Sequence, residues 1–215
     1  MVPCPRPPSL IAWSVRTFSE VRLHYGRRPG LAFLHTIVGS PVFVFCGKGK
    51  GMRIFFDTEF LEDGKTIDLI SIGMVREDGE ELYLVNQEAD WRRIYAEPWL
   101  MDNVVPQLPP MREAVTRKRI AIAVNAFCGG RVAQWTAPTF NPEFWAYYAD
   151  YDWVVLCQLF GRMIDLPEGW PMYCRDFKQL IDERGFEPKK QETGDHNALE
   201  DARWLKTEFL RLSEA

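Results

Sequence analysis

The sequence predicts an α/β domain in which helices pack against a mixed β-sheet. Three observations carry this prediction. Apolar, β-rich segments open the core, amphipathic helical segments and one further strand follow them, and the composition is globular, with 47% hydrophobic and 26% charged residues among 215. This composition excludes a disordered chain, a collagen and a coiled-coil rod. No run of 18 clean apolar residues occurs, so a typical membrane-spanning helix is not expected.

The core opens with a predicted three-strand meander. Residues 52–56 form a short apolar strand, and residues 66–75 are rich in β-branched side chains. The Asp78-Gly79 turn signal connects the second strand to a returning strand at residues 81–85.

The rest of the core alternates helical patterns with one strand. Apolar residues at helical spacing predict helices over residues 90–105, 111–124, 151–162, 175–184 and 196–212, and residues 144–148 predict a buried strand. Prolines after residue 105 end the first helix, and Gly185 closes the fourth. Residues 125–142 are rich in Gly, Thr and Pro and are expected to form a loop.

Residues 1–51 form an N-terminal extension unlike the core. Residues 1–50 carry a net charge of +6, against −10 for the rest. The Gly/Lys run at 47–51 implies purine-rich codons, as in a ribosome-binding site, so we expect a start-site artefact with translation beginning at Met52, or a disordered segment. A targeting segment, a basic arm that contacts nucleic acid, and a membrane anchor at residues 31–46 are the alternatives.

Asp57 and Glu59 stand two residues apart on the first predicted strand. Alternation sends both side chains to one face of the sheet, while Phe56 and Thr58 face the other way. Two carboxylates so placed repel each other unless a positive group lies between them, and a divalent cation is the usual partner. An isolated pair of this kind is more often exposed at a strand end, so the prediction needs further support.

Two later segments supply that support. Asp152 lies where the strand at 144–148 gives way to a helix, with Asp150 as a rival, although either acid could simply cap the helix. His196 and Asp201 are separated by about 500° of helical rotation, so they converge only if His196 lies at or just before the first turn. The helix dipole there favours the neutral imidazole that a general base needs.

Three motifs in this order resemble the DEDDh exonucleases. They are F-D-T-E-F on the first strand, Y-D after the internal strand and H-N-A-L-E-D-A on the last helix. This branch of the RNase H-like superfamily includes RNase T, oligoribonuclease and proofreading exonuclease subunits. The resemblance covers about residues 52–212 and is closest to RNase T-like 3′-exoribonucleases of the polyadenylate-specific AS type.

The resemblance implies a fold and an activity for residues 52–215. The fold is an RNase H-like three-layer arrangement, with a central mixed sheet and helices on both faces. The activity is hydrolysis of 3′-terminal phosphodiesters of single-stranded RNA or 3′ overhangs, releasing nucleoside 5′-monophosphates. The metal-binding acids of the family match Asp57, Glu59, Asp152 and Asp201, and its catalytic histidine matches His196.

The implied chemistry needs two divalent cations, Mg²⁺ or Mn²⁺. Such a pair neutralises the phosphodiester, binds the attacking water and stabilises the leaving oxygen. The four carboxylates supply hard oxygen ligands, Asp57 is best placed to bridge both ions, and His196 takes the proton from water. Thr58 and Phe60 are the expected substrate-binding residues, with Phe60 either stacking on the terminal base or packing in the core.

Single-stranded nucleic acid is the expected partner, and the preference for RNA rests on the resemblance alone. Basic residues could follow its backbone at 117–119, at Arg175 with Lys178, and at Lys189-Lys190, although each could equally be a solvated surface. Relatives are often homodimers, which suggests a homodimer here. No membrane partner is expected. Five cysteines without a CxxC pair or zinc spacing favour a reduced, cytoplasmic compartment.

Two other functions stay open at this point. One is a 3′-5′ exodeoxyribonuclease of the proofreading or repair type, because no residue unambiguously reads the 2′-hydroxyl. The other is a catalytically inactive RNase H-like binding module. The presence of all four carboxylates and the histidine argues against the inactive module.

Overall fold

The computed structural model describes residues 51–131, 133 and 137–214. Among these residues a five-stranded mixed sheet has the order β3-β2-β1-β4-β5. The strands are β1 (Gly51–Glu62), β2 (Ile67–Arg76), β3 (Glu81–Val85), β4 (Asn141–Ala146) and β5 (Arg175–Asp176). Strands β1, β2 and β3 form the antiparallel meander that the sequence predicts, and β4 and β5 run parallel to β1. The predictions made for residues 1–50 lie outside the described residues.

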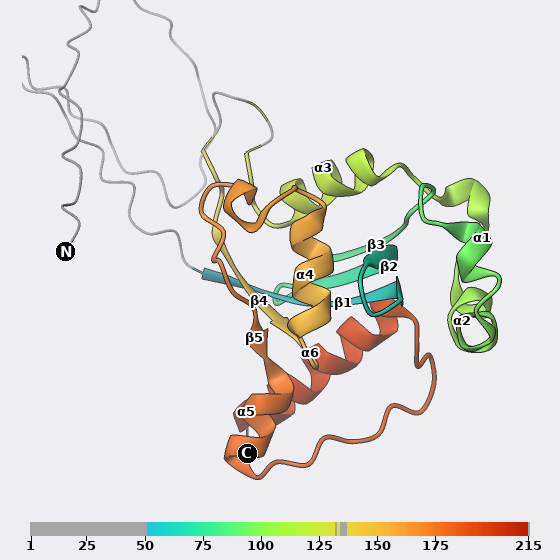
Figure 1. Ribbon diagram of the computed structural model, residues 1–215. Coiled ribbons are helices and arrows are strands. Elements are labelled where there is room, and N and C mark those ends of the chain that lie inside the picture. Colours follow the sequence, from blue (N-terminus) through green and yellow to red (C-terminus); the bar gives the residue numbers. More distant parts are fainter. Residues whose placement is uncertain (1–50, 132, 134–136, 215) are drawn as a thin grey trace, which may run out of the picture. The chain divides into compact units, whose positions relative to one another are not determined.

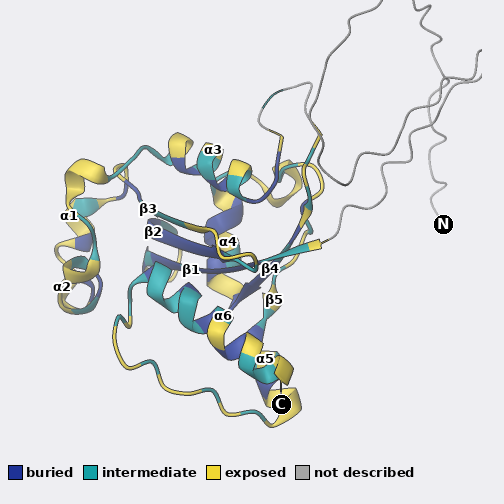
Figure 2. Ribbon diagram, turned by 180° about the vertical axis from the view of Figure 1, so that it is seen from behind, coloured by how far each residue is buried: buried dark blue, intermediate teal, exposed yellow. Residues whose placement is uncertain are grey.

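Helices cover both faces of this sheet (Figure 1). They are α1 (Trp91–Ile94), α2 (Pro98–Asn103), α3 (Arg117–Phe127), α4 (Asp150–Gln158), α5 (Phe177–Arg184) and α6 (Ala198–Glu214), with short 3₁₀ turns η1 (Val105–Gln107), η2 (Met111–Glu113) and η3 (Met163–Asp165). Side chains of α3 and α4 pack with Ile54 and Phe56 on one face, whereas α5 and α6 pack with Phe55 on the other. The alternating side chains of β1 therefore contribute to two cores, and Figure 2 shows the central strands β1 and β2 largely buried between the helices.

The sequence predicts one helix over residues 90–105, but the structure has two short helices there. The prediction of a single continuous helix is therefore wrong. Glu97 has extended dihedrals (φ −92°, ψ 108°) because the ring of Pro98 disfavours the helical region for the preceding residue. Pro98 then starts α2, where its missing N–H costs nothing.

Other boundaries shift for local reasons. The helix expected from residue 111 starts only at Arg117, because Thr116 caps it and Val115 forms a β-bridge with Asn86. Strand β5 was not expected; it is only two residues long, too short for any periodicity, and Asp176 then caps α5.

A bulge interrupts the pairing of β1 with β2. Glu59 pairs with Ser71 and Phe60 with Leu69, which leaves Ile70 as the extra residue. Ile70 is fully buried and anchors a third cluster that includes Ile94 of α1. The bulge therefore fastens the α1–α2 segment to the sheet beside Glu59.

Helix α6 approaches β2 unusually closely at Gly73, the residue directly opposite Asp57. A Cβ atom built on Gly73 would lie 2.2 Å from backbone atoms of Ala198 and Leu199. Only glycine permits this approach, which brings the first turn of α6 over the carboxylates of β1.

We expect the Gly73→Ala protein to lose about 2–3 kcal/mol of unfolding free energy, because its new methyl group meets backbone that cannot rotate away. Urea denaturation measures this loss. Gly51→Ala is the matched control, since its Cβ meets only a carbonyl oxygen at 3.9 Å. Equal stability of the two variants would show that the close contact is not a constraint.

Candidate active site

Three acidic side chains from two elements converge at the middle of the sheet. Asp57 and Glu59 alternate along β1, and Asp201 lies in the first turn of α6. One carboxylate oxygen from each lies within 4.8 Å of those of the other two. The structure thus brings together three of the four predicted acids in a group of metal-binding size.

The fourth predicted acid, Asp152, comes from the first turn of α4. Its Oδ1 accepts hydrogen bonds from the Thr58 backbone N–H (2.9 Å) and hydroxyl (2.5 Å). Asp152 is 6% exposed, whereas its rival Asp150 is exposed to solvent. The Thr58 hydroxyl is therefore already hydrogen-bonded to Asp152. The expected role of Thr58 in substrate binding stays a prediction.

Burial perturbs all four carboxyl groups, and repulsion from neighbouring carboxylates adds to its effect. Burial is the main cause that raises the pKa of Asp57 well above its ordinary value, and the negative charges of the other three add to it. Burial also raises the pKa of Glu59 to about 8, aided by the charges of Asp201 and Asp152. The pKa values of Asp152 and Asp201 each rise to about 6, mainly through burial, although hydrogen bonds to both oppose the shift. Such shifts cluster at functional sites.

His196 lies two residues before α6, as the geometry of the sequence motif predicts. Its backbone has φ +67°, and its N–H donates to Asp201 Oδ2 (3.1 Å). The imidazole packs edge-on against Trp99 of α2, with ring centroids 4.8 Å apart. The side chain of Asn197 donates to the Gln107 carbonyl (3.1 Å), which fastens the histidine loop to the α2–η1 segment.

Sequence reasoning missed Gln191, which positions Asp201. Its Nε2 donates to Asp201 Oδ1 (2.8 Å) and to the Thr193 carbonyl (3.2 Å). Gln191 lies ten residues before Asp201, in a segment without regular structure. No periodicity or motif in the sequence signals this contact.

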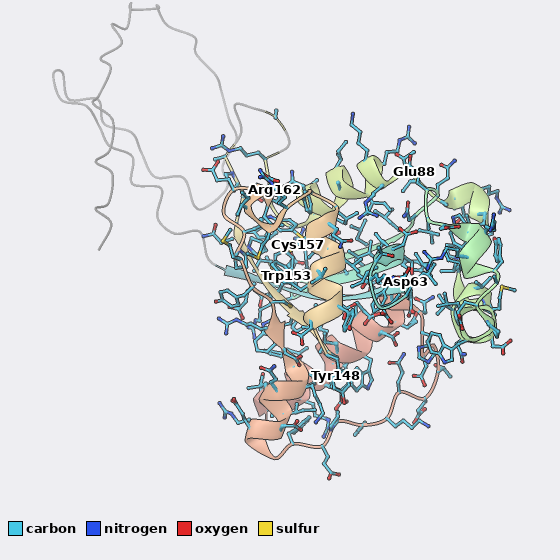
Figure 3. All side chains as sticks on the ribbon, in the orientation of Figure 1. Asp63, Glu88, Tyr148, Trp153, Cys157 and Arg162 are labelled. Carbon is cyan, nitrogen blue, oxygen red and sulfur yellow. The ribbon has the colours of Figure 1, made fainter. Side chains whose placement is uncertain are left out.

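A cavity of about 350 Å³ opens beside the carboxylates and is lined by aromatic rings. Phe60 and Tyr151 stack nearly parallel there, with centroids 5.9 Å apart. Trp99, Tyr148 and Tyr151 are each at least 50% exposed. Figure 3 shows Tyr148 where α4 begins, and its φ of +59° is a strained conformation for a tyrosine. We call this the aromatic cavity.

Of the seven predicted basic residues, three take part in ion pairs and two line a cavity. Arg117 pairs with Asp68 (3.6 Å), Arg175 pairs with Glu143 (3.3 Å), and Lys178 pairs with Asp182. Lys189 and Lys190 instead line a second cavity that shares Asp57, His196 and Asp201 with the aromatic cavity.

The carboxylates fit a site for hard divalent cations. None of the ion pairs among the described residues involves any of the four, so the chain there supplies no lysine or arginine to neutralise them. Uncompensated buried charge is costly, and carboxylate oxygens are preferred ligands of Mg²⁺ and Mn²⁺.

Comparison with known proteins identifies the family. The sequence model of the 3′-5′ exoribonuclease Rv2179c-like domain matches residues 52–211. The chain belongs to this family. It is 43% identical over 155 residues to the 3′-5′ exoribonuclease Rv2179c of Mycobacterium tuberculosis strain H37Rv, and equally to 3′-5′ exoribonuclease MT2234.1 of strain CDC 1551. The alignment covers 71% of this chain and 88% of each relative.

Among the described residues, no helix has the length and apolar character needed to cross a membrane.

We expect the metal-free protein to lose stability as the pH rises from about 4.5 to about 8. Glu59 titrates near its ordinary value in the unfolded chain but near pH 8 in the folded protein, so the folded state binds more protons in this window. Unfolding free energy should fall by at least about 1.4 kcal/mol, the equivalent of one pKa unit. Urea denaturation in EDTA at pH 5 and pH 8 measures this change.

Glu59→Gln is the matched variant, because it keeps the shape of the side chain and removes its charge. At pH 8 without metal, this variant should be more stable than the unsubstituted protein. Adding Mn²⁺ should stabilise the variant less than it stabilises the protein that retains Glu59. An equal pH dependence in both proteins would contradict the assignment.

Proposed function

We propose that residues 52–214 form a metal-dependent 3′-5′ exoribonuclease. It hydrolyses the 3′-terminal phosphodiester of single-stranded RNA or of a 3′ overhang and releases nucleoside 5′-monophosphates. The observation that carries this proposal is the group of uncompensated carboxylates beside His196. Membership of the exoribonuclease family and the names of the two relatives support it.

Asp57, Glu59, Asp152 and Asp201 are the proposed metal-binding residues. Two divalent cations, Mg²⁺ or Mn²⁺, would supply charge neutralisation for the phosphodiester and acidify its attacking water. Thr58 keeps the Asp152 carboxylate oriented, and Gln191 does the same for Asp201. These hydrogen bonds hold the acidic side chains in place before substrate arrives, so little reorganisation is needed at reaction.

His196 is the proposed general base, because it borders both cavities at the carboxylates. An imidazole nitrogen accepts a proton from water while the water oxygen attacks phosphorus. The bond from phosphorus to the 3′-oxygen of the preceding nucleotide then breaks, this oxygen takes up a proton from solvent, and the phosphate stays on the released nucleoside. Trp99 and the Asp201 carboxylate hold the histidine loop in position for this transfer.

The aromatic cavity is the proposed site of the terminal nucleotide. Phe60 and Tyr151 present a stacked pair, and aromatic side chains stack on bases of any sequence in single strands. The adjacent Glu59 carboxylate could accept a hydrogen bond from the terminal 3′-hydroxyl.

We further assign the chain to the DEDDh, RNase T-like class with an RNase H-like fold. A mixed sheet with helices on both faces supports the fold assignment, and the placement of His196 five residues before Asp201 supports the class.

We expect 5′-labelled single-stranded RNA to shorten from its 3′ end in Mg²⁺ or Mn²⁺ but not in EDTA. Asp57→Asn should abolish shortening, because it removes the central ligand. His196→Ala should lower kcat at least about 100-fold while substrate still binds, as is typical of a lost general base. DNA of equal length in the same assay distinguishes an exodeoxyribonuclease, and no shortening of either polymer would indicate an inactive binding module.

The stacking role of Tyr151 predicts a change in KM. Tyr151→Ala should raise KM for RNA about tenfold, since stacking on one base contributes about 1–3 kcal/mol. Val154→Ala is the control, because Val154 is 44% exposed on the same helix but does not line the aromatic cavity. If both substitutions leave KM unchanged, bases do not stack at this ring.

A further inference from the structure

The second cavity has a volume of about 460 Å³, within the range of small-molecule sites. It lies between α6 and residues 188–191 of the segment that connects α5 to α6, which Figure 1 shows returning to the start of α6. Its lining includes Tyr147 and Trp204. Because Asp57 and His196 line this cavity and the aromatic cavity alike, the proposed reaction centre stands at their junction.

The connecting segment is held firmly at Lys189. Its backbone N–H donates to Glu208 Oε2 (2.9 Å), and its carbonyl accepts from Trp204 Nε1 (2.7 Å). Glu208 is only 3% exposed and also pairs with Arg211 (2.6 Å). A buried carboxylate in the core of α6 therefore fixes where the backbone of Lys189 lies.

Lys189 and Lys190 are exposed, and neither takes part in an ion pair with any described residue. Among the described residues that line the two cavities, they are also the only lysine or arginine side chains. The aromatic cavity has exposed rings but no such cation. The two sides of the reaction centre thus differ in charge: both cavities have aromatic rings, but only the second is lined by lysines.

A nucleic-acid strand also differs in charge on the two sides of its last phosphodiester. The terminal nucleotide carries one phosphate, which is the scissile one. The preceding nucleotide carries the next phosphate on its 5′ side, and that anion must be placed near four carboxylates. A cationic wall is the appropriate surface for it, because amines neutralise backbone phosphates.

We propose that this second cavity binds the penultimate nucleotide of the RNA, with Lys189 and Lys190 facing its 5′-phosphate. The proposal rests on the proposed exoribonuclease function and adds the direction in which the strand crosses the site. The terminal nucleotide lies in the aromatic cavity, and the strand leaves past the connecting segment.

Three substrates test this assignment. The dinucleotide pUpU carries the phosphate in question, and UpU lacks it. Uridine 5′-(4-nitrophenyl phosphate) has a terminal nucleotide and a scissile phosphodiester but no penultimate nucleotide. The unsubstituted protein should hydrolyse pUpU with a kcat/KM about tenfold above that for UpU, equivalent to about 1.4 kcal/mol.

The double variant Lys189→Gln/Lys190→Gln should lose this preference, so that its pUpU and UpU values agree within about twofold. Its hydrolysis of the nitrophenyl ester should be unchanged. With longer RNA, the slope of log KM against log salt should fall by about 0.7, the value for one neutralised phosphate of a single strand. Arg92→Gln/Arg184→Gln is the control, since it removes the same charge from exposed positions that line neither cavity.

The possible failures are distinct. If the ester and RNA are not cleaved in an Asp57-dependent reaction, the proposed exoribonuclease function is wrong. If they are cleaved but the lysine variant keeps the preference for pUpU, the cavity assignment alone is wrong. An equal loss in the Arg92→Gln/Arg184→Gln control would also overturn the assignment, because net charge rather than a local contact would then explain it.

Discussion

The main constraint on this structure is that four carboxylates are buried close together beside the second half of β1, where like charges repel. Burial raises their pKa values, and the described ion pairs do not include them. The chain supplies hydrogen-bond donors instead of cations: Thr58 to Asp152, and Gln191 to Asp201. Donors orient an acid without neutralising it, so the net negative charge is left for a divalent cation. The proposed metal chemistry follows from that imbalance.

Two backbone features of β2 allow the carboxylates and His196 to come this close together. Gly73 lets the first turn of α6 approach the sheet, which places Asp201 above Asp57. The bulge at Ile70 anchors the α1–α2 segment, which carries Trp99 to the imidazole of His196. Neither feature touches substrate in the proposed function, yet both set the distance between the acids and the base.

The sequence predicted much of this arrangement because its patterns are local. The meander, the helical spacing of α6 and the placement of His196 before the first turn are confirmed. The continuous helix over 90–105 was wrong because Pro98 acts on Glu97, and strand β5 was missed because two residues carry no period. Gln191 could not be found, since its contact with Asp201 depends on the path of an irregular segment.

By itself the sequence determined the three-strand meander, the alternation that aims Asp57 and Glu59 the same way, and the spacing of His196 from Asp201. These are properties of neighbouring residues, which backbone periodicity dictates. Only the tertiary structure decided that Asp152 rather than Asp150 is buried, and that Lys189 and Lys190 rather than the other basic residues line a cavity together with Asp57 and Asp201. Both outcomes depend on how helices far apart in the chain pack on one sheet, and no local pattern records that packing.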